Sequence, residues 1–131
     1  LRGERFALLL PGTHWPTKRW PAERIAALAA LLARDGLRIA IGGGPDVGEI
    51  ARAIKATHAD ALDLTGRTNL FELIDLLGRA AVVITNDSGP MHLAAALGRP
   101  MVSLFGPTSA VRTGPFGRSE TVVRLPIACA P

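Results

Sequence analysis

Short apolar runs alternate with helical segments along this 131-residue chain, and that alternation limits the fold more than any other feature. The runs at residues 6–10 and 81–85 are apolar at nearly every position, as is typical of strands covered on both faces. The segments between such runs place apolar residues such as Ile25, Leu28 and Leu32 at helical spacing. Strands that alternate with helices of about ten residues predict an α/β domain whose parallel sheet has helices on both faces.

The chain is long enough for one domain, and residues 1–131 are interpreted as a single Rossmann-like unit. About six strands are expected, at residues 6–10, 37–41, 61–64, 81–85, 101–104 and 121–124. The first strand should be central in a doubly wound parallel sheet of order 3-2-1-4-5-6, with ligands beyond the carboxyl ends of strands 1 and 4. Because the chain starts at Leu1 and a strand follows almost at once, it is expected to be a piece of a longer protein.

Charge and cysteine content exclude several classes of function. The net charge is +4, but the arginines are scattered and only Lys18 and Arg19 form a compact basic pair, so nucleic acid is not an expected partner. The single cysteine, Cys129, excludes a disulfide framework and is consistent with the cytoplasm. No apolar run reaches the roughly 20 residues of a membrane span, so contact with a membrane is expected to be peripheral at most.

The loop after the first strand, residues 11–21, carries the first ligand-binding signal. Gly12 lets the backbone approach a ligand, and Thr13 offers a hydroxyl. Lys18 and Arg19 bring positive charge to the point where the winding of the sheet reverses, as a diphosphate requires. The alternatives are that Lys18 is a solvated surface charge and that Arg19 simply faces solvent. Because Gly12 and Thr13 are in the same loop, a ligand-binding role is favoured for Lys18.

The loop after the fourth strand, T-N-D-S-G-P-M-H at residues 85–92, carries the second signal. A helix begins here, and its N-terminus presents unpaired N–H groups that suit an anion. Ser88 and Gly89 let hydroxyl and backbone donors gather around phosphate oxygens, and His92 can point at the same anion or pair with Asp87. Taken singly, Asp87 resembles an ordinary N-cap and His92 a structural histidine. The whole string, at this place in the fold, indicates a ligand site.

Three further loops at the same edge carry weaker signals. The glycine run at 42–44 precedes Asp46 and Glu49, and an acid here either binds ribose hydroxyls or is a carboxylate favoured by the helix dipole. Residues 65–68 either border a base pocket or form a plain connection, and residues 105–109 are expected to be a structural turn. The sequence contains no zinc signature, P-loop or nucleophile elbow.

Two of these strings together resemble a known family. T-N-D-S-G-P-M-H-L-A-A-A-L-G-R-P at 85–100, followed by L-F-G-P-T at 104–108, is closely similar to the ADP-heptose:lipopolysaccharide heptosyltransferases. P-G-T at 11–13 with K-R-W-P at 18–21 matches that family's other donor-side motif. The resemblance covers essentially the whole chain, and Asn86 is among the details that look more like heptosyltransferase II than I.

The resemblance implies the C-terminal, donor-binding half of a GT-B glycosyltransferase that transfers heptose from ADP-heptose to the lipopolysaccharide inner core, with inversion and without a cofactor or metal. By position, it implies that Lys18 neutralises the diphosphate with help from Thr13. Ser88 and Gly89 would hold phosphate oxygens. Asp87 would bind sugar hydroxyls, and His92 would support the phosphate pocket. Glu49 lies where the family has a ribose-binding acid, and Thr68 lies where the chain passes the adenine.

The same resemblance places the catalytic aspartate and most of the acceptor surface in an N-terminal domain that this chain lacks. The chain also ends before the family's final helix, at residue 131. We therefore expect it to bind the donor without turnover, with the lipopolysaccharide core contacted through the absent domain. The protein is expected in the cytoplasm, with any membrane contact peripheral and at the inner face of the cytoplasmic membrane. The alternatives are a GT-B transferase or an epimerase that uses another nucleotide sugar, and a non-catalytic nucleotide-binding domain.

Overall fold

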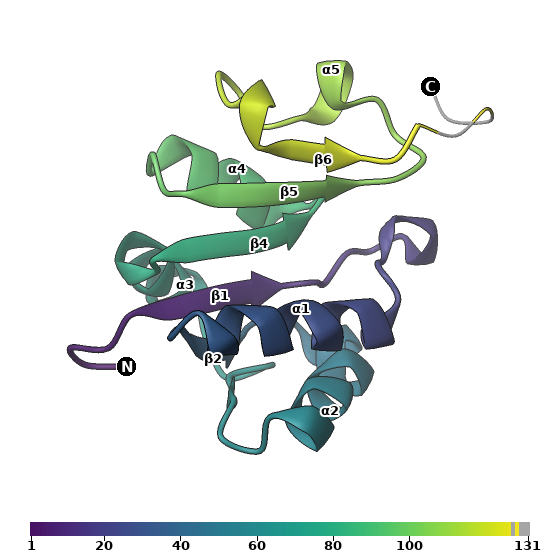
Figure 1. The fold of residues 1–131 in the computed structure, drawn as a ribbon. Coiled ribbons are helices and arrows are strands. Elements are labelled where there is room, and N and C mark those ends of the chain that lie inside the picture. Colours follow the sequence, from purple (N-terminus) through teal and green to yellow (C-terminus); the bar gives the residue numbers. More distant parts are fainter. Residues whose placement is uncertain (127, 129–131) are drawn as a thin grey trace.

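A six-stranded parallel sheet forms the centre of the protein in a computed structural model that describes residues 1–126 and 128 (Figure 1). Its order, β3-β2-β1-β4-β5-β6, confirms the predicted topology. The strands are β1 (Phe6–Leu10), β2 (Arg38–Ile41), β3 (Leu62–Asp63), β4 (Val82–Asn86), β5 (Met101–Phe105) and β6 (Val122–Arg124). Cys129 and the last two residues, on which two expectations rest, lie outside the described residues.

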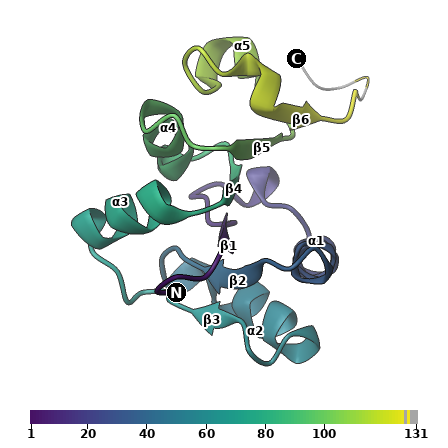
Figure 2. The same cartoon turned by 60° about the vertical axis from the view of Figure 1, so that its left-hand side comes forward.

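Helices cover both faces of the sheet, as predicted. Figure 2 shows α1 and α2 on one side of the strands and α3 and α4 on the other. The described helices are α1 (Ala22–Arg34), α2 (Gly48–Thr57), α3 (Leu70–Arg79), α4 (Gly89–Ala96) and α5 (Ala110–Thr113), with short 3-10 turns at Pro16–Lys18, Pro45–Val47 and Ser119–Thr121. The sequence did not predict α5 or these turns, because elements of three or four residues are too short to show a periodicity. Among the described residues, no helix has the length and apolar character needed to cross a bilayer.

The core explains why the strands are apolar at every position. All five residues of β1 are buried, and they alternate between two apolar clusters. Ala7 and Leu9 pack toward α1 and α2, whereas Phe6, Leu8 and Leu10 pack toward α3 and α4. A strand with helices on both faces has no solvent side, so a polar residue would be buried on either face.

The parallel register brings the carboxyl ends of the strands to one edge. Leu9 of β1 lies opposite Ile41 of β2 and Ile84 of β4. The loops that follow β1, β2 and β4 therefore start side by side, although they are about 30 residues or more apart in sequence.

A capping box begins α3, with Asn69 as the N-cap residue. The Asn69 Oδ1 atom accepts from the Glu72 backbone N–H at 3.0 Å, and Glu72 Oε2 accepts from the Asn69 backbone N–H at 2.8 Å. These two bonds satisfy donors that a helix N-terminus otherwise leaves free.

Replacing Asn69 tests the contribution of this cap to stability. Asn69→Ala should lower the free energy of unfolding by about 1 kcal/mol, measured by urea denaturation. Asn69→Asp keeps the acceptor oxygen at the positive end of the helix and should retain the stability of the original chain. Equal stability of the alanine variant and the original chain would show that solvent satisfies these donors equally well.

Candidate functional site

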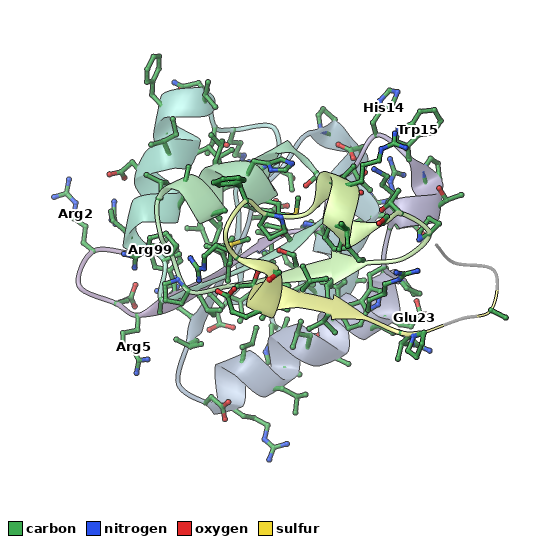
Figure 3. All side chains as sticks on the ribbon, turned by 90° about the horizontal axis from the view of Figure 1, so that it is seen from above. Arg2, Arg5, His14, Trp15, Glu23 and Arg99 are labelled. Atoms are coloured by element: carbon green, nitrogen blue, oxygen red, sulfur yellow. The ribbon has the colours of Figure 1, made fainter. Side chains whose placement is uncertain are left out.

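A cavity of about 770 Å³ opens at the carboxyl edge of the sheet. Its walls come from the loops after β1, β2, β3 and β4 and from the first residues of α3 and α4. In Figure 3, His14, which lines the cavity, lies at one end of the molecule, whereas Arg2, Arg5 and Arg99 lie toward the other. The cavity lies where the strand order predicts a ligand, and its volume falls within the usual range for small-molecule sites.

The loop after β1 folds back on itself, and this places Arg19 at the cavity. The 3-10 turn Pro16–Lys18 reverses the chain, and the Arg19 Nε and Nη2 atoms donate to the Thr13 carbonyl at 3.2 and 3.0 Å. Arg19 Nη2 also lies 3.5 Å from Asp46 Oδ2, and both side chains line the cavity. Arg19 is exposed, as the second interpretation of it allowed, but it also lines the cavity, because a turn that the sequence did not reveal brings its guanidinium group to the Thr13 carbonyl.

Gly12 and Gly43 meet around the side chain of Val47. A Cβ atom on Gly12 would lie 2.9 Å from the Val47 Cγ2 atom, and one on Gly43, whose φ is +127°, would lie 2.7 Å from it. Both glycines line the cavity with backbone. Their lack of a side chain thus lets two loops pack on one methyl group, in addition to keeping the backbone open to a ligand as predicted.

The loop after β4 is fastened to the loop after β1. Asn86 is fully buried, and its Nδ2 atom donates to the Pro11 carbonyl at 2.6 Å. Ser88 is the N-cap of α4, but its hydroxyl donates to the Asn86 carbonyl at 3.3 Å, and no described side chain caps the helix. Because the first N–H groups of α4 lack a side-chain acceptor and Ser88 and Gly89 line the cavity, this wall can receive an anion.

Lys18 and Asp87 form a shielded ion pair next to these residues. The Lys18 Nζ atom lies 2.8 Å from Asp87 Oδ2, and their side chains are 19% and 6% exposed. The Thr108 hydroxyl donates to the same oxygen at 2.7 Å, and the Thr113 hydroxyl lies 3.4 Å from it. Burial alone would raise the pKa of Asp87, but the hydrogen bonds from Lys18 and Thr108 and the charge of Lys18 outweigh it and lower the pKa.

The contacts of Asp87 test the interpretations of Asp87 as an N-cap and as a partner of His92. They also test the interpretation of residues 105–109 as a structural turn. Asp87 is neither the N-cap of α4 nor, among the described contacts, a partner of His92, which is exposed on α4. Residues 105–109 do more than form a turn, since Thr108 reaches Asp87. The sequence could not reveal this contact, because it depends on the pairing of β4 with β5, in which Asn86 lies opposite Leu104.

The cavity gathers some of the predicted site residues and not others. Thr13, Thr68, Ser88 and Gly89 line it, and Lys18 and Asp87 adjoin lining residues in the chain. Glu49 and His92 are exposed and are not among its lining residues, so their roles stay predictions. Asp46, the first acid after the glycine run, lines the cavity in place of Glu49.

Positive charge at this edge comes from side chains and a helix end. In the part of the chain that the structure describes, no group of three His, Cys, Asp or Glu residues could hold a metal ion. Lys18, Arg19 and the N-terminus of α4 therefore supply the attraction for an anion among the described residues.

Comparisons with known proteins agree on one family. The family model described as glycosyltransferase family 9 (heptosyltransferase) matches residues 2–131. The lipooligosaccharide heptosyltransferase 2 of Haemophilus influenzae is 39% identical over 132 residues, which cover 95% of this chain and 38% of that protein. The chain thus spans about two fifths of the length of the curated relatives it matches.

Two solved structures show the same fold. The structure of E. coli ADP-heptose lipopolysaccharide heptosyltransferase II superposes with a TM-score of 0.87 at 35% identity and covers 98% of this chain and 41% of that one. The structure of E. coli heptosyltransferase WaaC with ADP has a TM-score of 0.85 at 33% identity and covers 94% of this chain and 38% of that one.

The environment of Asp87 predicts a specific dependence of stability on pH. Since folding lowers its pKa, its stabilising contribution is complete above the unfolded value of about 3.9 and is lost as the pH falls through the lower folded value. The free energy of unfolding should therefore fall less steeply below about pH 4 in Asp87→Asn than in the original chain. Asp60→Asn, at an exposed carboxylate without a recorded partner in the described part of the chain, should follow the original curve. Identical acid slopes for all three proteins would contradict this account.

Proposed function

The chain belongs to glycosyltransferase family 9, the heptosyltransferases, and from this premise we propose that it binds the nucleotide-sugar donor ADP-heptose. The observation that carries the proposal is that Arg19 and the α4 N-terminus line one cavity, with Lys18 next to Arg19 in the chain and paired with Asp87 beside Ser88. The matches to two structures of E. coli heptosyltransferase WaaC, one with ADP and one with ADP-2-deoxy-2-fluoro heptose, support adenosine diphosphate as the nucleotide.

In this proposal the pyrophosphate lies between the loop after β1 and the start of α4. The backbone N–H groups at Ser88 and Gly89 donate to phosphate oxygens, with the Thr13 hydroxyl on the opposite wall. An ammonium group has three N–H donors, so Lys18 keeps donors for the phosphate while it faces Asp87. Phosphate is strongly favoured here because charge-assisted hydrogen bonds add to the helix dipole.

The nucleoside then occupies the part of the cavity between β2 and α3. Thr68 and the side chains of Leu70 and Leu73 line this part and offer an apolar wall to adenine. For the ribose hydroxyls, Glu49 must turn its exposed side chain toward the cavity, whereas Asp46 lines the cavity already.

Transfer with inversion requires a base that activates the acceptor hydroxyl while ADP leaves. Lys18 and the α4 N-terminus are placed to stabilise the charge that grows on ADP as its bond to the sugar breaks. Asp87 is a poor base, because Lys18 and Thr108 hold it as a carboxylate, and Asp46 is paired with Arg19. We place the base and the lipopolysaccharide acceptor site in sequence that the relatives have beyond the matched two fifths.

The two lysines of the chain provide a matched test of donor binding. Lys18→Met should weaken ADP-heptose binding at least about tenfold, because it removes a charge-assisted contact to the pyrophosphate. Lys55→Met is the control, since Lys55 lies on α2 and its Nζ atom donates to the Ala61 carbonyl. Titration calorimetry should show these effects, with UDP- and GDP-sugars binding more weakly than ADP-heptose to the original chain. Equal affinity of the Lys18 variant would refute the site, and preference for another nucleotide would redirect the proposal to another donor.

Donor binding by these residues, with the base outside them, also predicts how the 131-residue chain behaves in a transfer assay. Mixed with ADP-heptose and a lipopolysaccharide core acceptor, it should release no ADP above background, because Asp46, which lines the cavity, and Asp87, which adjoins it, are paired with Arg19 and Lys18. The full-length Haemophilus influenzae relative serves as the positive control. Turnover by the chain would show that the base lies within these residues.

A further inference from the structure

Asp87 is held in an asymmetric way. The Lys18 ammonium at 2.8 Å, the Thr108 hydroxyl at 2.7 Å and the Thr113 hydroxyl at 3.4 Å all face one carboxylate oxygen, Oδ2. Among the described residues, no donor is recorded on Oδ1. The protein therefore fixes the carboxylate through one oxygen and leaves the other free to accept a hydrogen bond.

Thr108, and not Thr113, is the hydroxyl that holds Asp87. The Thr113 hydroxyl lies 3.2 Å from the Ser109 carbonyl, closer than its 3.4 Å to Asp87, and one O–H proton serves one short bond at a time. The Thr108 hydroxyl lies 2.7 Å from Asp87, a distance typical of a short bond to a charged acceptor. Thr108 follows β5 and Asp87 follows β4, so the pairing of these strands keeps the two residues together.

Donor binding changes which partners stabilise the buried Asp87 carboxylate. Lys18 faces Asp87, and in the proposed function it also faces the pyrophosphate, so two anions share its charge when the donor is bound. A largely buried carboxylate is costly when its cation is shared, and a nearby pyrophosphate adds repulsion. Thr108 is neutral and does not respond to the ligand's charge, so its hydrogen bond persists.

We infer that Thr108 is a positioning residue: its hydroxyl keeps the Asp87 carboxylate charged and oriented while Lys18 engages the donor's pyrophosphate, so that Oδ1 can accept from a sugar hydroxyl. The inference rests on the proposed function and adds a residue from the loop after β5 to a group of residues that otherwise follow β1 and β4.

The groups around Asp87 support this role. Burial raises the pKa of Asp87, and the hydrogen bonds from Lys18 and Thr108 are the largest effects that lower it. Lys18 is the charged group that faces Asp87 among the described residues, whereas Thr108 and Thr113 carry no charge. His92 on α4 and Arg112 on α5 are exposed, with no recorded contact to Asp87 in the described part of the chain.

The test compares Thr108→Val, which removes the hydroxyl, with Thr108→Ser, which keeps it. ADP-heptose affinity is measured by calorimetry from about pH 4 to about pH 8, a range in which its esterified phosphates do not titrate. At the upper end Thr108→Val should bind about tenfold more weakly, because an ionised Asp87 without its hydroxyl partner competes with the pyrophosphate for the Lys18 ammonium group. The deficit should shrink toward the lower end, since loss of the hydroxyl raises the pKa of Asp87 and a protonated carboxyl does not compete for Lys18, and Thr108→Ser should follow the original chain throughout.

A second measurement does not depend on the ligand. The NMR titration of the Asp87 carboxyl carbon in the free chain should show a higher pKa in Thr108→Val and an unchanged one in Thr108→Ser. Thr57→Val is the matched control, because it also removes a threonine hydroxyl, one bonded to the Ile54 carbonyl at the end of α2.

The outcomes separate this inference from the proposed function. A loss of affinity that is equal at every pH, or shared by Thr108→Ser, would overturn the positioning role, as would an unchanged carboxyl titration in Thr108→Val. If the original chain does not bind ADP-heptose, the proposed function and the ligand-dependent part of the inference both fail. The carboxyl titration still decides whether Thr108 holds Asp87.

Discussion

The ion pair between Lys18 and Asp87 is the interaction on which the arrangement of the candidate site depends. A carboxylate that is 6% exposed requires a partner, because burial disfavours its charge. Lys18 comes from the loop after β1 and Asp87 from the loop after β4, so satisfying this charge fixes one loop against the other. The hydrogen bond from Asn86 to the Pro11 carbonyl fastens the same two loops a few residues nearer the sheet.

In this arrangement, the contacts that fix the loops differ from the groups that are available to bind a ligand. Buried contacts through Asn86, Thr108 and the Gly12–Val47 packing set the positions of the loops. The groups suited to a ligand, namely the uncapped start of α4 and the donors of Lys18, keep unused hydrogen-bonding capacity toward the cavity. A site built in this way can bind a diphosphate with little rearrangement of the backbone, because helix and cation are already directed at one volume.

The family match and the geometry of the site give independent support for ligand binding by the two loops. The family match covers residues 2–131 and therefore includes both ligand-binding loops. It does not specify which side chains meet, and the structure supplies the contacts of Arg19, Asp46 and Thr108. Each of them occupies its position because of a contact between segments far apart in the sequence: Arg19 with Asp46, and Thr108 with Asp87.

The sequence by itself determined the order of strands and helices, the central place of β1, the capping box of α3 and the two loops that meet at the cavity. These features follow from local rules, since periodicity, capping and strand order act over a few residues or over the alternation of whole elements. Only the tertiary structure decided that Lys18 pairs with Asp87, that Arg19 folds back over Thr13, and that Thr108 reaches across from β5. The physical reason is that these contacts depend on strand register and on the path of short turns, which place side chains within a few ångströms of one another and leave no periodic trace in the chain.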